Sequence, residues 1–125
     1  MSANDYSNYT KITLKCADDA KLRAFWAREV YDILIDKLKY DYDKTTYLTV
    51  HDDYNDYKIF RGPDGDDLFI DRDLFTIWFD ELKAPSLYQE LLWAAAKEET
   101  WKGVNIFVER TPEIEDHVRL KYLGI

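Results

Sequence analysis

The chain has 125 residues and little of what disulfide-stabilised, fibrous or membrane proteins are built from. Its only cysteine is Cys16, so an internal disulfide is impossible and a four-cysteine zinc site is excluded. Four glycines and three prolines exclude collagen-like and low-complexity chains. The apolar run 91–96 is far shorter than the roughly 20 residues that span a bilayer. With a polar, acidic N-terminus unlike a signal peptide, these absences predict a cytoplasmic protein that does not bind membranes.

Motifs for catalysis and metal binding are also missing. The two histidines, His51 and His117, have no second ligand at helical spacing, and there is no Cys-x-x-Cys pair. The EF-hand spacing, Gly-x-Ser-x-Gly and a phosphate-binding loop are absent. Cys16 ends an expected strand, as a small core residue would. We therefore predict no catalytic site, no cofactor and no metal site; an enzyme would have to use His51 and its neighbouring aspartates.

Hydrophobic periodicity predicts an α+β protein. Alternation of apolar and polar residues predicts a strand at 9–16. Apolar residues at steps of three and four then predict an amphipathic helix at 17–39, capped by Asp18 or Asp19. The stripe that should face the sheet is Leu22, Phe25, Trp26, Val30, Ile33, Leu34 and Leu38.

The rest of the chain predicts further strands and two helices. Helices are expected at 71–83 and 87–101, the second begun by a capping box of Ser86 and Gln89. Residues 112–123 fit either a strand or a short helix. Further strands are expected at 45–51, 57–60, 68–70 and 104–108, with turns at 52–56 and 61–67. The aromatic residues expected on helix faces in the core are Phe25, Trp26, Phe75, Trp78, Phe79 and Trp93.

The expected order β-α-β-β-(β)-α-α-β-(β) is that of a ferredoxin-like or similar two-layer sandwich, with an antiparallel or mixed sheet. No repeat or linker divides the chain, so we predict a single domain over 1–125, with 1–8 as a flexible tail.

Negative charge is concentrated in the middle of the sequence. The chain has a net charge of −8, and residues 41–80 hold eleven aspartates against four basic side chains. A surface of this sign repels phosphate, which argues against direct binding to nucleic acids or anionic membranes. It would attract a basic protein surface, including one built to hold nucleic acid.

Tyrosine and aspartate interleave in the same region. Tyrosine is enriched at interfaces, and carboxylates beside aromatic rings suit arginines of a partner. The alternatives are ordinary solvated turns, or hard oxygen ligands for calcium or magnesium. The candidate partner-binding residues are Asp41, Tyr42, Asp43, Asp52, Asp53, Tyr54, Asp56, Tyr57, Asp64, Asp66 and Asp67.

These features favour a small acidic binding protein that inhibits a larger protein with a basic surface. The partner would be a nuclease, a nucleic-acid-guided effector or a toxin. The hypothesis therefore covers an anti-defence inhibitor of the phage type, a mimic of DNA charge and a toxin immunity protein. The alternative from a different class is a small-molecule-binding or regulatory domain on a ferredoxin-like sheet.

Overall fold

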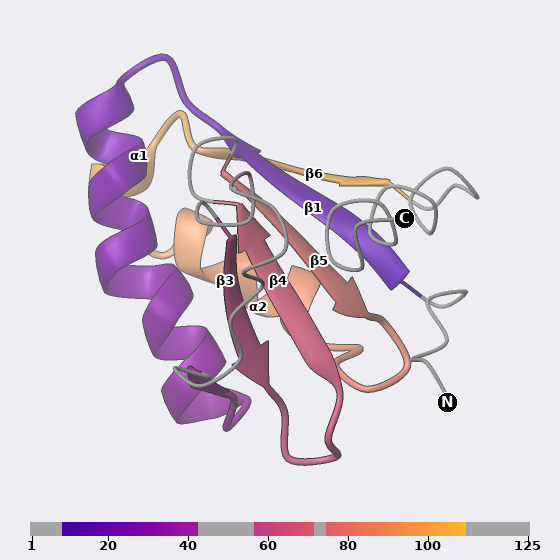
Figure 1. Cartoon of the computed structure of the whole chain (residues 1–125). Helices are drawn as coiled ribbons and strands as arrows, with labels where there is room; N and C mark the ends of the chain where they lie inside the picture. The colour runs from indigo at the N-terminus through magenta and orange to yellow at the C-terminus, as the bar shows by residue number, and fades with distance from the viewer. Residues whose placement is uncertain (1–8, 43–56, 72–74, 110–125) are drawn as a thin grey trace.

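The computed structural model describes residues 9–42, 57–71 and 75–109. Their centre is an antiparallel sheet of six strands in the order β2-β3-β4-β5-β1-β6 (Figure 1). The strands are β1 (Tyr9–Lys15), β2 (Asp41–Tyr42), β3 (Tyr57–Arg61), β4 (Asp67–Asp71), β5 (Thr76–Asp80) and β6 (Asn105–Glu109). The helical elements are α1 (Asp19–Phe25), η1 (Trp26–Val30), η2 (Ile33–Lys37), α2 (Leu87–Ala96) and η4 (Glu99–Trp101). The coarse prediction of a mixed α+β fold is confirmed.

A long helix follows β1, as the periodicity predicted. It begins at α1, where the Asp18 carboxylate caps it by accepting a hydrogen bond from the Lys21 N–H at 3.1 Å. It continues through η1 and η2, two widened turns of π type; the Leu38 N–H donates to the Ile33 carbonyl, five residues back. The predicted apolar stripe packs into the core, and only Leu38, at its end, is half-buried.

The core lies between one face of the sheet and the helices. Ile12 of β1, Ile77 of β5 and Leu68 of β4 project to the same face, because β1 pairs with β5 and β5 with β4 in register. They join the helical stripe and the buried face of α2 in a single hydrophobic cluster. The opposite face is also buried along the cross-strand row of Ile59, Phe69 and Trp78.

One buried carboxylate ties the helical elements together. Glu29 of η1 accepts a hydrogen bond from the Trp101 indole N–H at 3.0 Å and pairs with the Lys97 ammonium at 2.8 Å. A second ion pair joins Lys37 of η2 to Glu90 of α2 at 3.1 Å. The long helix and α2 therefore run antiparallel, since the earlier residue of one meets the later residue of the other.

The prediction of a helix at 71–83 is wrong for the residues described, because Thr76–Asp80 forms strand β5. Ile77 and Phe79 face the helices, whereas Thr76 and Trp78 lie on the opposite face, and all four are buried. A strand buried on both faces reads as a continuous apolar run, without the alternation that marks a half-buried strand. Its apolar side chains therefore fitted a helical stripe by chance.

Two predictions about the second helix are also wrong. Ser86 stands at the N-cap of α2, but its side chain makes no capping hydrogen bond, so the capping box does not form. Trp93, expected in the core, is 59% exposed. The helix ends at Ala96, and η4 then leads to Gly103, whose φ of 97° suits a residue without a side chain.

The strands expected at 9–16, 57–60, 68–70 and 104–108 are confirmed as β1, β3, β4 and β6, as is the 61–67 turn. The strand expected at 45–51, the 52–56 loop and the element at 112–123 lie outside the described residues, as do His51, His117 and the 1–8 tail. Cys16 is half-buried against the core, consistent with its expected role. Across 9–42, 57–71 and 75–109, no helix has the length and apolar character needed to cross a bilayer.

Candidate functional site

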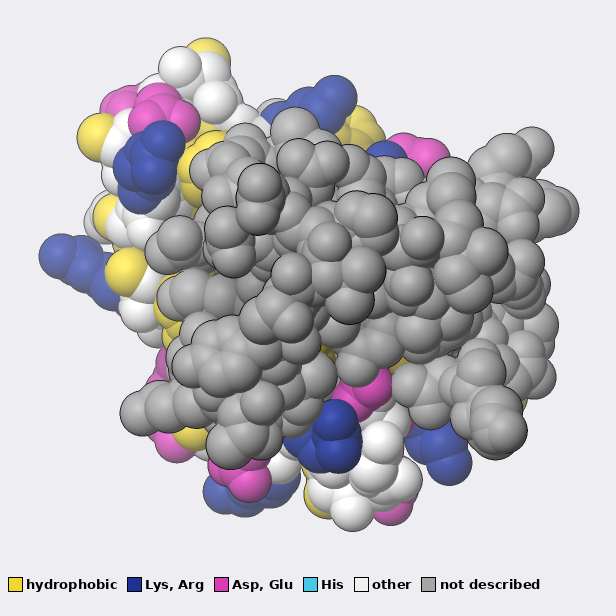
Figure 2. Space-filling view, in the orientation of Figure 1, with side chains coloured by type: hydrophobic (Ala, Val, Ile, Leu, Met, Phe, Trp, Pro, Cys, Tyr) yellow, Lys and Arg dark blue, Asp and Glu magenta, His cyan; other side chains and the backbone are white. Residues whose placement is uncertain are grey.

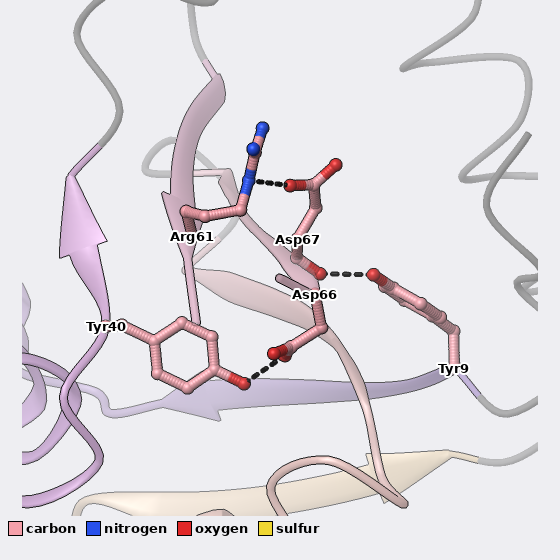
Figure 3. Close-up of polar contacts among 5 residues, drawn as sticks. All are labelled: Tyr9, Tyr40, Arg61, Asp66 and Asp67. Atoms are coloured by element: carbon pink, nitrogen blue, oxygen red, sulfur yellow. Dashed lines mark hydrogen bonds and ion pairs between the residues drawn. The ribbon is translucent and has the colours of Figure 1, made fainter. Parts of the chain in front are cut away.

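The candidate site is built around Tyr40, which follows the long helix. Lys39 takes a φ of 63°, so the chain turns sharply after the helix, and the Tyr40 N–H donates to the Leu34 carbonyl at 2.8 Å. The Tyr40 ring is 2% exposed, and its hydroxyl donates to the Asp66 carboxylate at 2.5 Å (Figure 3). The end of the helix is thereby fixed to the turn between β3 and β4.

That turn needs glycine at two positions. The Gly62 N–H donates to the Asp66 carbonyl at 2.8 Å, and a Cβ on Gly62 would collide with the Asp66 carboxylate and the Tyr40 ring. Gly65 donates to the Gly62 carbonyl at 3.0 Å and has a φ of 82°. The bare backbone at Gly62 is therefore what lets the tyrosine reach its aspartate.

Asp67 points away from Asp66 and belongs to the fold (Figure 3). Its carboxylate, 4% exposed, accepts a hydrogen bond from the Arg61 Nε–H at 2.6 Å. Its backbone carbonyl accepts another from the Tyr9 hydroxyl. Asp66 is the last residue of the turn and Asp67 is the first of β4; one acid meets Tyr40 and the next meets Arg61.

Several carboxylates act electrostatically on the Tyr40 hydroxyl. Burial raises the pKa of Tyr40 well above its usual value, and the hydrogen bond to Asp66 raises it further. The negative charges of Asp66, Asp80 and Asp64 add to the same shift. The next residue, Asp41, is exposed and pairs across strands with Arg61. We call Asp64, Asp66 and Asp80, which act on the Tyr40 hydroxyl, together with the exposed neighbouring residue Asp41, the Tyr40 acidic cluster.

The structure brings together only part of the predicted site. Asp41 and Asp64 are exposed and Asp66 is half-buried, whereas Asp67 is buried and paired within the protein, so it no longer belongs among the partner-binding candidates. Tyr42 and Tyr57 lie in β2 and β3. The remaining candidates stay predictions, because they lie outside the described residues: Asp43, Asp52, Asp53, Tyr54 and Asp56.

Sequence reasoning left Asp80 out of the candidate set. It assigned this residue to a helix, whereas Asp80 ends β5, where its carboxylate also accepts a hydrogen bond from the Leu82 N–H at 2.9 Å. An aspartate two residues before a turn N–H is a turn signal that was available in the sequence.

The cluster does not resemble a metal site. Among the described residues, no group of three or more histidine, cysteine, aspartate or glutamate side chains is arranged to hold an ion.

In the space-filling view, the visible part of the long helix at the left carries acidic, basic and hydrophobic side chains side by side (Figure 2). The chain was compared with protein-family models, curated proteins and solved structures, and it matches none of them.

Proposed function

We propose that this protein is a small acidic inhibitor that binds a basic surface of a larger protein. The observation that carries the proposal is the Tyr40 acidic cluster, where the buried Tyr40 hydroxyl holds Asp66 at 2.5 Å in the same turn as the exposed Asp64. Like charges gathered at one place repel and add little to folding, so a cationic partner is the ligand that would stabilise them.

The arrangement suits recognition because it is anchored. Asp66 is held by the buried Tyr40, and Asp64 is held in a turn closed by two backbone hydrogen bonds. Carboxylates fixed in advance lose little conformational entropy on binding, and those that remain exposed speed the encounter with a positive surface. The partner would lose access to its own anionic ligand, because the acidic cluster would occupy the basic groups that hold it.

We propose further that the protein acts in the cytoplasm and without chemistry of its own. The lone Cys16 is a free thiol, which suits a reducing compartment. The hydrogen-bonded and ion-paired acids described above serve the fold or face outward, and we assign none of them a substrate.

The ferredoxin-like topology is our proposal for the fold. Within the sheet, β6, β1, β5 and β4 follow one another, and each neighbouring pair is antiparallel. The long helix separates β1 from the β2–β5 segment in the sequence, and α2 separates β5 from β6. A split βαβ arrangement has this order, with β2 and β3 then added at one edge.

The function is tested by capture and inhibition. Immobilised wild-type protein is exposed to extract of its native host, and each captured protein is purified and assayed for its own activity. We expect a protein with a basic surface whose activity falls when the inhibitor is added. The Asp41→Lys/Asp64→Lys variant should lose at least about tenfold in affinity, since both acids are exposed.

The matched control is Asp19→Lys/Glu99→Lys, which reverses two exposed acids of α1 and η4. It makes the same change in net charge and should retain most of the affinity. The proposal is wrong if no captured protein is inhibited, or if both double variants lose affinity equally. The class of the captured protein also decides between an anti-defence inhibitor and a toxin immunity protein.

A further inference from the structure

Trp93 is the exposed member of the four tryptophans. Its exposed fraction is 59%, whereas Trp26, Trp78 and Trp101 are 5%, 1% and 1% exposed. A large indole ring left in water is unfavourable for a free surface, and tryptophan is enriched where one protein binds another.

Two ion pairs frame Trp93 along α2. Glu90 lies three residues before it and Lys97 four residues after it, so the three side chains share one helical face. Glu90 pairs with Lys37 and Lys97 pairs with Glu29, both of which belong to the long helix. Trp93 therefore lies on α2 between the two residues that pair with the long helix.

Two further carboxylates of the long helix lie between Glu29 and Lys37 in the sequence. Asp32 and Asp36 are both exposed and lie four residues apart, about one helical turn. Interaction with the Asp36 carboxyl group raises the pKa of Asp32, with a smaller contribution from burial. Lys37 and Lys97 act in the opposite direction and lower the pKa of Asp32.

The charges on this surface do not balance. Lys37 and Lys97 are each within 3.1 Å of a glutamate, so the two ammonium groups already have carboxylate partners. Asp32 and Asp36 add two more exposed acids on the long helix, between the two residues that form these pairs. This set, which we call the Trp93 surface, is Trp93 with Asp32 and Asp36, bordered by the Lys37–Glu90 and Lys97–Glu29 pairs.

We propose that the Trp93 surface docks an arginine-bearing segment of a partner protein. A guanidinium group is planar, so it can stack on the indole ring and donate paired hydrogen bonds to carboxylates. A lysine ammonium group offers no such plane. The unbalanced carboxylates would repel phosphate, which favours a protein partner over a nucleic acid. The inference does not rest on the proposed function, because it uses none of the Tyr40 acidic cluster.

The test uses a capped Gly-Arg-Gly-Arg-Gly peptide as the probe and the full-length protein. Acrylamide quenching of tryptophan fluorescence reports mainly on Trp93, since the other three rings are buried. We expect the peptide to protect the tryptophan fluorescence from quenching in a saturable way, and to give no protection in Trp93→Phe. A Gly-Lys-Gly-Lys-Gly peptide should bind at least about fivefold more weakly, because it cannot stack or donate in pairs.

Substitutions then locate the binding site. Asp32→Asn/Asp36→Asn should weaken arginine-peptide binding at least about tenfold, through loss of the charged hydrogen bonds. Asp19→Asn/Glu99→Gln removes two exposed acids elsewhere on the protein. It should change the affinity for the arginine peptide less than about threefold, which is the effect of net charge alone. Circular dichroism checks that each variant is folded.

Three results would overturn the inference: no protection of Trp93, equal binding of the lysine peptide, or equal losses in the two double variants. Asp41→Lys/Asp64→Lys should weaken peptide binding only through net charge, and less than Asp32→Asn/Asp36→Asn does. The Trp93 surface and the Tyr40 acidic cluster can therefore succeed or fail independently.

Discussion

Trp26 and Trp101 lie in the same hydrophobic core but differ in the state of the indole N–H. The Trp101 N–H donates to the Glu29 carboxylate at 3.0 Å. The Trp26 N–H is buried and has no acceptor within hydrogen-bonding distance among the described residues. Replacing each tryptophan by phenylalanine makes the same chemical change at two sites that differ in this one bond, so the pair isolates its contribution.

The expected free energies of unfolding follow from that difference. Each substitution loses part of a buried ring, about 1–2 kcal/mol. Trp101→Phe also loses a hydrogen bond to a charged group, about 1.5–3 kcal/mol. Trp26→Phe instead removes an unpaired buried donor, which returns about 1–3 kcal/mol. Trp26→Phe should therefore stay within about 2 kcal/mol of the wild type, and Trp101→Phe should be less stable than Trp26→Phe by about 2.5–6 kcal/mol.

Urea unfolding followed by circular dichroism at 222 nm measures both variants without relying on tryptophan fluorescence. Trp26→Ala provides the scale, because full removal of this buried ring should cost about 3–5 kcal/mol. In a double-mutant cycle, Glu29→Gln should couple more strongly to Trp101→Phe than to Trp26→Phe, because only the Trp101 indole donates to Glu29. Equal losses from the two phenylalanine variants, or equal coupling of Glu29 to both tryptophans, would refute this reasoning.

Three further predictions use the described contacts. Asp18→Ala should lower the free energy of unfolding by about 1 kcal/mol, because Asp18 caps α1. Ser86→Ala should lower it by less than about 0.5 kcal/mol, because Ser86 makes no capping hydrogen bond, and thermal melts compare the two variants. Tyr40→Phe should cost about 1–2 kcal/mol at neutral pH through its bond to Asp66. The folded-state pKa of Tyr40 is raised above the usual value of 10.0. The contribution of the protonated hydroxyl to the free energy of unfolding is therefore fully present below pH 10 and is lost as the pH rises above it. Urea titrations at increasing pH should therefore show a shallower alkaline loss of stability in Tyr40→Phe; an unchanged slope would contradict the assignment. Gly62→Ala should destabilise the protein more than Gly65→Ala, because a Cβ at position 62 collides with the Tyr40 ring. A Cβ at position 65 meets no atom, so Gly65→Ala incurs only left-handed backbone strain of about 1–2 kcal/mol. A reversed order in urea unfolding would contradict the turn geometry.

Local pattern predicted best the elements that keep one exposed face; β4 was also predicted although it is buried throughout, because its short apolar run follows a turn. β1 alternates and the long helix has an apolar stripe, so both were recognised; of the two predicted helix caps, Asp18 and Asp19, the structure uses Asp18. β5 is buried on both faces, which removes the alternation that marks a strand. Trp93 was assigned to the core because its spacing fits a helical stripe, but that stripe extends past the buried face of α2.

The candidate site was predictable in composition but not in contacts. The concentration of aspartates pointed to the region of Asp64 and Asp66, which the structure places beside Tyr40. Only pairing across the sheet shows that Asp67 meets Arg61 and lies buried. Asp80 joins the cluster through strand pairing, which no local spacing encodes.

The central claim is that acids of the Tyr40 acidic cluster steer a basic partner. The most direct measurement is the association rate constant with the protein captured from the host, followed by stopped flow across a range of NaCl concentrations. For the wild type, the rate should fall steeply as salt rises, because screening weakens steering. For Asp41→Lys/Asp64→Lys, it should be slower in low salt and nearly flat, while Asp19→Lys/Glu99→Lys keeps most of the slope. Identical salt dependence in all three proteins would contradict the claim.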